Sequence, residues 1–271
     1  MGIAKVSCRD RLTYVFDLDG VVYRGDEPQP HATQTILALR DQGHIVRFYT
    51  NNSARSREWY CARLGRLGIP TPIDEIMTSS YATALYFVEN HETGRTVYQI
   101  GQEGVTHELE AVGMKVIRNG DEPDARIDYV VVGMDKDFNY RKLARAQSAI
   151  LAGAKFVATN EDMTFPAEGG AIRPGNGCLV AAVRAATSTE PFVIGKPHEY
   201  ALLKVLELAD TPRDRAVIVG DNLATDIVAG NRVGIHTVLV LTGLTSREQA
   251  QNATGEMKPE RIVQTLSELV R

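Results

Sequence analysis

Short apolar runs alternate along this chain with segments whose apolar residues recur at helical spacing. The runs that predict buried strands lie at residues 14–16, 45–49, 96–100, 129–133, 155–159 and 216–219. The segments that predict amphipathic helices lie at residues 32–42, 57–67, 103–112, 141–151 and 178–186. Strands that alternate with helices indicate an α/β protein built on a parallel or mixed sheet.

The alternation restarts in the middle of the chain, which indicates two domains. Residues 82–183 are long enough to form a compact α/β domain of their own. We therefore expect this domain to be inserted between residues 1–81 and 184–271, which together would form the other domain.

Two later stretches carry weaker patterns. Turn-forming residues crowd the stretch from Asn160 to Gly177, which predicts a structured loop and no sheet element. Long ordered loops are often functional, and surface filler is the alternative. The stretch from Pro259 to Val270 predicts a final helix.

The composition is ordinary for a soluble globular protein, with 44% hydrophobic and 24% charged residues among 271. A net charge of −4 gives no indication of a nucleic-acid or membrane partner, and we expect neither. No apolar run approaches the roughly 20 residues of a membrane helix, and the N-terminus lacks the apolar core of a signal peptide. Cys8, Cys61 and Cys178 are scattered, which indicates free thiols and a cytoplasmic location.

Candidate chemistry begins where the first apolar run ends, at Asp17-Leu18-Asp19-Gly20. Side chains two positions apart point the same way on an extended backbone, so the two carboxylates can lie together. Neighbouring carboxylates resist ionisation unless a cation relieves them, and Mg²⁺ prefers such oxygen ligands. A metal site at a strand end is one interpretation; a strand that runs into an acidic turn is the other.

Three further apolar runs also end in polar residues. Thr50-Asn51-Asn52-Ser53 precedes a helical pattern and suits an anion site, although on this stretch alone a helix cap by Ser53 or Asn52 is the favoured interpretation. Lys196 follows the short run 192–194 and could reach an anion, or could be a solvated surface lysine. The last run leads into Gly220-Asp221, with Asp226 five residues further on.

The four strand ends together favour the functional interpretation. In one parallel sheet, all such ends share one edge. Carboxylates, a hydroxyl, amides and a lysine gathered there suit a phosphate ester beside a divalent cation.

In these residues the sequence resembles the haloacid dehalogenase superfamily of phosphatases. Asp17-Leu18-Asp19-Gly20-Val21 matches its first motif, Thr50 the second, Lys196 the third, and Gly220-Asp221 through Asp226 the fourth. Within the superfamily the chain is similar to class IIA, the NagD-like, p-nitrophenyl phosphatase and phosphoglycolate phosphatase group. Further carriers of that resemblance are residues 17–26, 50–53, 159–162, 174–177, 195–197 and 220–227.

The resemblance implies a Rossmann-like parallel-sheet core with a large inserted α/β cap domain of the C2 type. It also implies hydrolysis of small phosphate monoesters, with Asp17 as nucleophile and Asp19 as general acid and base. Thr50, the backbone of Asn51, and Lys196 would hold the phosphoryl oxygens. Gly20, Asn52 and Asn222 would also line the substrate site.

By the same resemblance the cofactor is Mg²⁺, held by Asp17, the backbone carbonyl of Asp19, and Asp221. Asp226 would orient these ligands without binding the metal. The partner would be a small-molecule phosphate ester, and a homodimer through the cap domain is an expectation of the same kind.

The cap loop of this class selects the leaving group, so Phe165 is a candidate for substrate contact or for packing alone. Pyridoxal-phosphate-specific relatives carry a histidine where Phe165 stands, which argues against a vitamin-B6 substrate. Two other functions remain open on the same fold: a phosphotransferase, and an inactive protein that binds phosphorylated metabolites.

Overall fold

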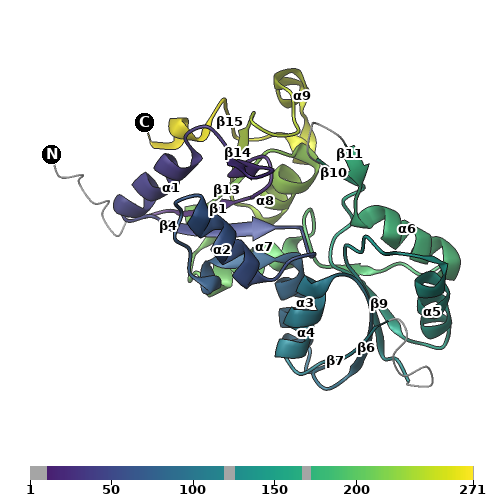
Figure 1. The fold of residues 1–271 in the computed structure, drawn as a ribbon. Coiled ribbons are helices and arrows are strands. Elements are labelled where there is room, and N and C mark those ends of the chain that lie inside the picture. Colours follow the sequence, from purple (N-terminus) through teal and green to yellow (C-terminus); the bar gives the residue numbers. More distant parts are fainter. Residues whose placement is uncertain (1–10, 119–125, 167–171, 271) are drawn as a thin grey trace. The chain divides into compact units, whose positions relative to one another are not determined.

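The computed structural model describes residues 11–118, 126–166 and 172–270, and Cys8 lies outside them. The described chain divides into two compact units (Figure 1). The first unit consists of residues 11–50, 60–77 and 196–270, and the second of residues 51–59 and the described parts of 78–195.

The second unit is larger than the inserted domain expected at residues 82–183. Its last strand, β12 (Phe192–Val193), pairs with β9 (Lys155–Ala158), and its first long helix, α3, begins at Ser79. Residues 51–59 belong to it as well. Whether a segment belongs to one unit or the other depends on its contacts with residues distant in the chain, which the pattern of apolar residues along the sequence does not show.

The first unit is built on a six-stranded sheet in the order β15-β14-β13-β1-β4-β5. Its strands are β1 (Thr13–Phe16), β4 (Ile45–Thr50), β5 (Ile76–Thr78), β13 (Ala216–Gly220), β14 (His236–Val240) and β15 (Arg261–Val263). β1 lies between β13 and β4 and runs parallel to both. The residues of β1 and β13 are all buried, as expected for parallel strands covered on both faces. The carboxyl ends of β1, β4 and β13 therefore meet at one edge.

Helices and turns complete the first unit. They are α1 (Ala32–Asp41), α7 (Glu199–Leu208), α8 (Val228–Val233), α9 (Arg247–Asn252), the π-helical turn η4 (Leu223–Ile227) and the 3₁₀ turns η1 (Ile73–Glu75), η3 (Arg213–Arg215), η5 (Gly255–Met257) and η6 (Leu266–Val270). Helix α2 (Arg57–Arg66) belongs to the first unit from Tyr60 onward. α1 packs on β4 and η6, and α7 packs on β4 and α8. A small hairpin of β2 (Tyr23–Arg24) and β3 (Glu27–Pro28) follows the turn at Gly20.

The second unit holds a five-stranded parallel sheet in the order β12-β9-β8-β6-β7. Its remaining elements are α3 (Ser79–Glu89), β6 (Thr96–Ile100), α4 (Glu103–Ala111), β7 (Lys115–Ile117), β8 (Tyr129–Val132), α5 (Tyr140–Leu151) and α6 (Asn176–Thr187). Alternate side chains serve opposite faces: Tyr98 and Ile100 join the apolar cluster with α5 and α6. On the other face Gln99 accepts a hydrogen bond from Thr106 of α4. Figure 1 shows α3 and α4 on one side of this sheet and α5 and α6 on the other.

Two expectations from the sequence are wrong. The stretch 160–177 contains an antiparallel pair, β10 (Thr164–Pro166) with β11 (Ile172–Pro174), in place of a loop without sheet structure. The stretch 259–270 is not a helix but β15 followed by η6. Ile262, Val263 and Leu266 have helical spacing, but pairing of β15 with β14 decides the conformation. Within the described residues, no helix is long and apolar enough to cross a membrane.

Candidate active site

Asp17 directly follows β1 and is buried, and its backbone N–H donates to the carbonyl of Val219 on β13 at 2.9 Å. The chain then leaves the sheet in a turn in which the N–H of Gly20 donates to the carbonyl of Tyr23 at 2.8 Å. Gly20 has a φ of 89°, which favours glycine, and a Cβ there would lie 2.3 Å from Oδ2 of Asp221. The positive φ and the missing Cβ of Gly20 therefore allow the turn after Asp17 to pack directly against Asp221.

Asp221 and Asp226 come from the end of β13 and the π-helical turn η4 that follows it. Oδ2 of Asp226 accepts hydrogen bonds from the backbone N–H groups of Asp221 (3.2 Å) and Asn222 (3.1 Å). A Cβ at Gly220 would lie 2.1 Å from Cβ of Asp226, so this approach requires glycine. The five-residue spacing of the aspartates therefore folds Asp226 back onto the strand end.

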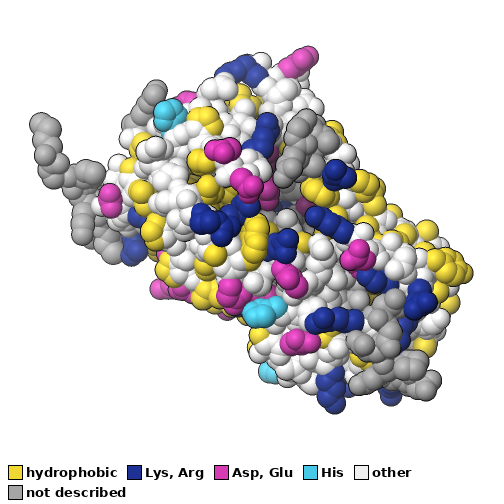
Figure 2. All heavy atoms as spheres, viewed as in Figure 1, with side chains coloured by type: hydrophobic (Ala, Val, Ile, Leu, Met, Phe, Trp, Pro, Cys, Tyr) yellow, Lys and Arg dark blue, Asp and Glu magenta, His cyan; other side chains and the backbone are white. Residues whose placement is uncertain are grey.

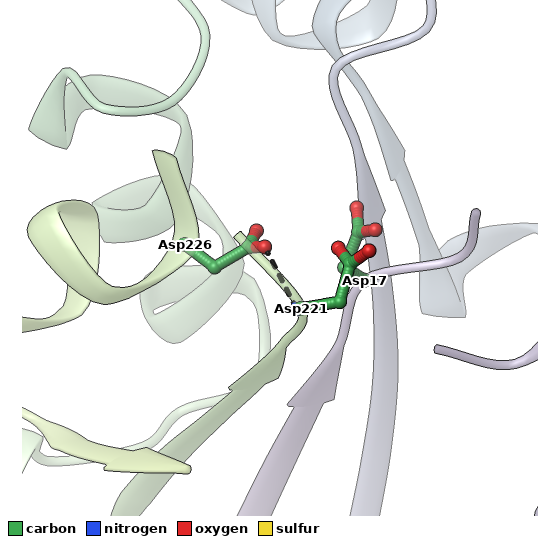
Figure 3. A group of neighbouring side chains, drawn as sticks. All are labelled: Asp17, Asp221 and Asp226. Atoms are coloured by element: carbon green, nitrogen blue, oxygen red, sulfur yellow. Dashed lines mark hydrogen bonds between the residues drawn. The ribbon is translucent and has the colours of Figure 1, made fainter. Parts of the chain in front are cut away.

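The carboxylates of Asp17, Asp221 and Asp226 converge: each offers an oxygen, and these oxygens lie within 4.8 Å of one another. Figure 3 shows Asp17 and Asp221 side by side, with Asp226 reaching toward the backbone of Asp221. Burial raises the pKa of Asp17 well above its ordinary value, and the charges of Asp226 and Asp221 add to the effect. Burial and the charge of Asp226 likewise raise the pKa of Asp221 to about 7.

Lys196 joins this cluster as its cation. Its Nζ lies 2.6 Å from Oδ1 of Asp17 and 2.6 Å from Oδ1 of Asp226, and the residue is 2% exposed. Burial alone would lower the pKa of Lys196, but the charges of Asp17 and Asp226 outweigh it and raise the pKa. The alternative of a solvated surface lysine is therefore wrong.

The strand that precedes Lys196 does not lie in the sheet in which the sequence placed it. The strand before it, β12, belongs to the sheet of the second unit and not to the six-stranded sheet. Only three of the four polar strand ends, those of β1, β4 and β13, share one sheet edge. Lys196 is instead the first residue of the chain's return to the first unit.

The donor set fits Mg²⁺. The ligands on offer are carboxylate oxygens, which this hard cation prefers. Burial, with the neighbouring carboxylate charges in addition, raises the pKa of Asp17 and Asp221, and a bound cation would offset both effects. Asp226 already accepts from Lys196 and from two backbone N–H groups, so it is suited to orienting the cluster. The chemistry of these side chains thus matches the cofactor expected from the sequence.

Asp19 is half-buried and does not belong to the converging carboxylates. Burial raises its pKa to about 6, while the positive charges of Arg63 and Lys196 act in the opposite direction. The buried phenols Tyr23 and Tyr60 also lie near it, and burial together with the Asp19 charge raises the pKa of both. This environment of Asp19 could not be predicted from the sequence, because Tyr60 and Arg63 come from α2, far along the chain.

A second group missed from the sequence is the turn after β14. The N–H of Leu244 donates to Oδ2 of Asp221 at 2.8 Å, and the hydroxyl of Thr242 donates to the carbonyl of Gly20 at 2.7 Å. A Cβ at Gly243 would lie only 1.7 Å from Oδ2 of Asp221. A glycine after a strand is too common to predict such a contact.

The remaining predicted residues lie as follows. Thr50 is the buried last residue of β4 in the first unit, and Asn51 is the first residue of the second unit. Oδ1 of Asn52 accepts from the N–H of Ala54 at 2.9 Å, and Oδ1 of Asn222 accepts from the N–H of Ala224 at 2.9 Å. Phe165 lies in β10, half-buried and opposite Arg173 of β11.

The helix-cap alternative for the segment after Thr50 does not hold. Helix α2 begins only at Arg57, beyond the reach of Asn52 or Ser53. Oγ of Ser53 accepts instead from the N–H of Met134, at 3.0 Å.

Comparisons with known proteins agree with this geometry. A family model described as haloacid dehalogenase-like hydrolase matches residues 14–115, and a second HAD-hydrolase-like model matches residues 193–269. An acid sugar phosphatase of Staphylococcus saprophyticus is 36% identical over 95% of this chain and 96% of its own. The chain belongs to the haloacid dehalogenase-like hydrolases. Its resemblance to the class IIA phosphatases is confirmed, and it is a phosphoric monoester hydrolase of that group.

Two more relatives extend the comparison within this family. A 5′-nucleotidase of Bacillus subtilis is 36% identical over 95% of this chain and 96% of its own. The solved structure of a glycerol phosphate phosphatase from Mycobacterium tuberculosis, in complex with magnesium, superposes with a TM-score of 0.87 at 35% identity. That match covers 96% of this chain and 76% of the other. The parallel-sheet hydrolase fold expected from the sequence is thereby confirmed. The magnesium bound in that relative agrees with the cofactor expected from the sequence, and the converging carboxylates of this chain could hold such an ion.

Proposed function

We propose that this hydrolase cleaves phosphate monoesters of small metabolites through an aspartyl-phosphate on Asp17. The observation that carries the proposal is the buried contact of Lys196 with Asp17, beside Asp221. A buried carboxylate is a nucleophile only in its ionised form, and a lysine 2.6 Å away favours that form. The same ammonium can neutralise charge on a phosphoryl group attacked by Asp17.

In the first step, a carboxylate oxygen of Asp17 attacks phosphorus, and the bond from phosphorus to the ester oxygen breaks. Asp19 gives its proton to the departing oxygen. Burial raises the pKa of Asp19 to about 6, which favours the protonated form that can serve as the acid. The products are the free alcohol and phosphorylated Asp17.

In the second step, Asp19, now ionised, takes a proton from water as the water oxygen attacks phosphorus. The bond from phosphorus to Asp17 breaks, orthophosphate is released, and both aspartates return to their starting states. Throughout, Thr50, the backbone of Asn51, and Lys196 hold the phosphoryl oxygens, with Gly20, Asn52 and Asn222 beside them.

Mg²⁺ would be held by Asp17, Asp221 and the backbone carbonyl of Asp19, with Asp226 fixing Asp221 through its backbone. When bound, the ion supplies positive charge to the phosphoryl oxygens. The three converging carboxylates support this assignment.

The first experiment measures hydrolysis of p-nitrophenyl phosphate by the purified chain with Mg²⁺ and no added acceptor. We expect turnover that excess chelator abolishes, that Mg²⁺ restores and that Ca²⁺ restores poorly, because Ca²⁺ takes more and longer bonds to oxygen. Turnover that appears only with an added alcohol would indicate a phosphotransferase. Binding of phosphorylated metabolites without any turnover would indicate an inactive binding protein.

The physiological substrate belongs to the same proposal. The relatives are named as an acid sugar phosphatase, a 5′-nucleotidase and a glycerol phosphate phosphatase, and sugar phosphates, nucleotides and glycerol phosphate are all small monoesters. A panel of these compounds, ranked by kcat/KM, would identify the class that this chain prefers. A preference for pyridoxal phosphate would contradict the expectation drawn from Phe165.

We further propose association of two copies through the second unit, the expected cap. Its edge strand β12 presents Phe192, which is 46% exposed and stacks on Tyr86 at 4.8 Å between ring centroids. Sedimentation of Phe192→Glu beside the wild-type chain tests this surface, and an equal mass of the two proteins would exclude it as the dimer interface.

A cytoplasmic location stays a prediction from the scattered cysteines, and cell fractionation would test it.

A further inference from the structure

The carbonyl of Asn51, the residue after Thr50, accepts two side-chain hydrogen bonds. Oγ of Ser79 donates at 2.6 Å, and Nδ2 of Asn160 donates at 2.5 Å. All three residues belong to the second unit and are buried, with exposed fractions of 6% for Asn51, 0% for Ser79 and 3% for Asn160. The donors stand 28 and 109 positions away along the chain. This peptide group is therefore fixed by tertiary structure and not by its own turn.

The side chain of Asn51 is held by the same turn of the second unit. Its Nδ2 donates to both carboxylate oxygens of Asp162, at 3.2 and 3.1 Å. Oδ1 of Asn160 in turn accepts from the N–H of Asp162 at 3.2 Å, so Asn160 and Asp162 belong to one hydrogen-bonded turn. Nδ2 of Asn176 braces that turn by donating to the carbonyl of Asn160 at 2.7 Å.

A fixed carbonyl also fixes the amide that follows it. The bond from Asn51 to Asn52 is not among the cis peptides of the described chain, so its C=O and N–H point in opposite directions. The N–H of Asn52 therefore points away from Ser79 and Asn160. The carbonyl end of the backbone at Asn51, which the proposed function assigns to phosphoryl binding, is thus oriented by two side chains. Asn160 lies in the 159–162 stretch of the family resemblance, whereas Ser79 lies outside every such stretch.

We propose that Asn160 and Ser79 are positioning residues that orient the Asn51 peptide group for binding the phosphoryl group. This inference rests on the proposed function, because it concerns the same phosphoryl contacts. A single donor would satisfy a buried carbonyl, whereas two donors fix its direction as well. Since every substrate shares the phosphoryl group, the effect of these residues must be independent of the leaving group.

The test uses two variants and one control in the full chain. Asn160→Asp keeps the shape and the oxygen that accepts from Asp162, but it replaces the donor to the Asn51 carbonyl by an acceptor. Ser79→Ala removes the other donor. Thr106→Val is the control, because it removes a buried hydroxyl of the second unit that donates at 2.6 Å to Gln99 and not to Asn51.

The assays are kcat and KM for p-nitrophenyl phosphate and for glycerol phosphate, and the inhibition constant of orthophosphate. We expect Asn160→Asp to lower kcat/KM on the order of 10–100-fold, by the same factor for both substrates. The inhibition constant of orthophosphate should rise roughly 10-fold, because a hydrogen bond to a charged oxygen is misplaced. Ser79→Ala should change both quantities in the same direction, and Thr106→Val should change neither.

Three results would overturn the inference. Unchanged kinetics and orthophosphate inhibition in both variants would show that the Asn51 peptide needs neither donor, while the phosphatase itself would stand. Equal losses in Thr106→Val would reduce the effect to general stability. A different loss for each substrate would assign these residues to the leaving group. Should Asn160→Asp fail to fold, the same criteria apply to Ser79→Ala. If the wild-type chain itself hydrolyses neither substrate, the proposed function is refuted instead.

Discussion

Gly243 is the residue at which a single methyl group should disturb the candidate metal site most. In Gly243→Ala, the new Cβ would lie 1.7 Å from Oδ2, 2.3 Å from Cγ and 2.4 Å from Cβ of Asp221. Because even Cβ of Asp221 is too close, rotating its carboxylate does not relieve the clash. Either Asp221 or the turn at Gly243 must move.

The size of the movement follows from these distances. Reaching even a tight contact of 3.0 Å requires a displacement of more than about 1 Å from the present 1.7 Å. The turn cannot retreat freely, because the Thr242 hydroxyl donates to the Gly20 carbonyl, and the Leu244 N–H donates to Asp221. A misplacement of about 1 Å in a catalytic group costs on the order of 10²-fold in rate, or about 2.7 kcal/mol of barrier.

The assay is kcat/KM for p-nitrophenyl phosphate across a Mg²⁺ titration. We expect kcat/KM of Gly243→Ala to fall on the order of 10²-fold and the Mg²⁺ concentration at half-maximal activity to rise roughly 10–100-fold. Gly65→Ala is the matched control, because Gly65 lies in helix α2, exposed, with nothing within 4 Å of the added Cβ. It should keep full activity and gain about 0.5–1 kcal/mol in the free energy of unfolding.

Wild-type kcat/KM and Mg²⁺ dependence in Gly243→Ala would refute this reasoning. Loss of activity at saturating Mg²⁺ without any change in Mg²⁺ dependence would remove Asp221 from metal binding and leave it a structural residue. If Gly243→Ala lowers the free energy of unfolding equally with and without Mg²⁺, Asp221 would likewise be a structural residue and not a metal ligand.

Three further predictions concern residues named from the sequence. Asp17→Asn should lower kcat by at least about 10³-fold while thermal unfolding remains cooperative, and near wild-type turnover would contradict the nucleophile assignment. Lys196→Met should lower the free energy of unfolding without Mg²⁺ by about 3–5 kcal/mol, because buried carboxylates lose their counter-charge. Lys204→Met, which removes a more exposed pair with Glu207, should cost less than about 1 kcal/mol in the same denaturant titration. Phe165→Ala should change the ratio of kcat/KM between p-nitrophenyl phosphate and glycerol phosphate about 10-fold while leaving the Mg²⁺ requirement unchanged, and a constant ratio would leave Phe165 a packing residue.

The parts of the fold that the sequence predicted share one physical property. β1 and β13 are buried on both faces, so each is an apolar run whose end is marked by a polar residue. β4 is interrupted by the half-buried Arg47 but also ends in buried residues. Asp17, Thr50 and Asp221 are those first polar residues or stand directly beside them. Their convergence at one edge then follows from the parallel arrangement alone.

The errors share another property, which is dependence on distant pairing. β15 has only three residues, and its apolar side chains also fit a helix, so only its pairing with β14 distinguishes the two conformations. β12 has two residues and could have joined either sheet. The close approaches of Gly20 and Gly243 to Asp221 likewise could not be predicted from the sequence, because a glycine in a sequence does not show which neighbouring residue leaves no room for a Cβ.

Charge explains why this cluster suits phosphate chemistry and not merely stability. Three buried carboxylates and one ammonium leave a formal charge of −2 when all are ionised. Burying such a group costs more than its ion pairs return, so the cluster is a poor way to stabilise a fold. A divalent cation would bring the total to zero, and an incoming phosphate would then meet the Lys196 ammonium and the cation in place of uncompensated carboxylates. The cluster is thus unfavourable for folding without a metal and reaches charge neutrality only with one, so we interpret it as a site for binding the cation and the phosphate. Stability without Mg²⁺ and activity with Mg²⁺ must therefore be measured on the same variants.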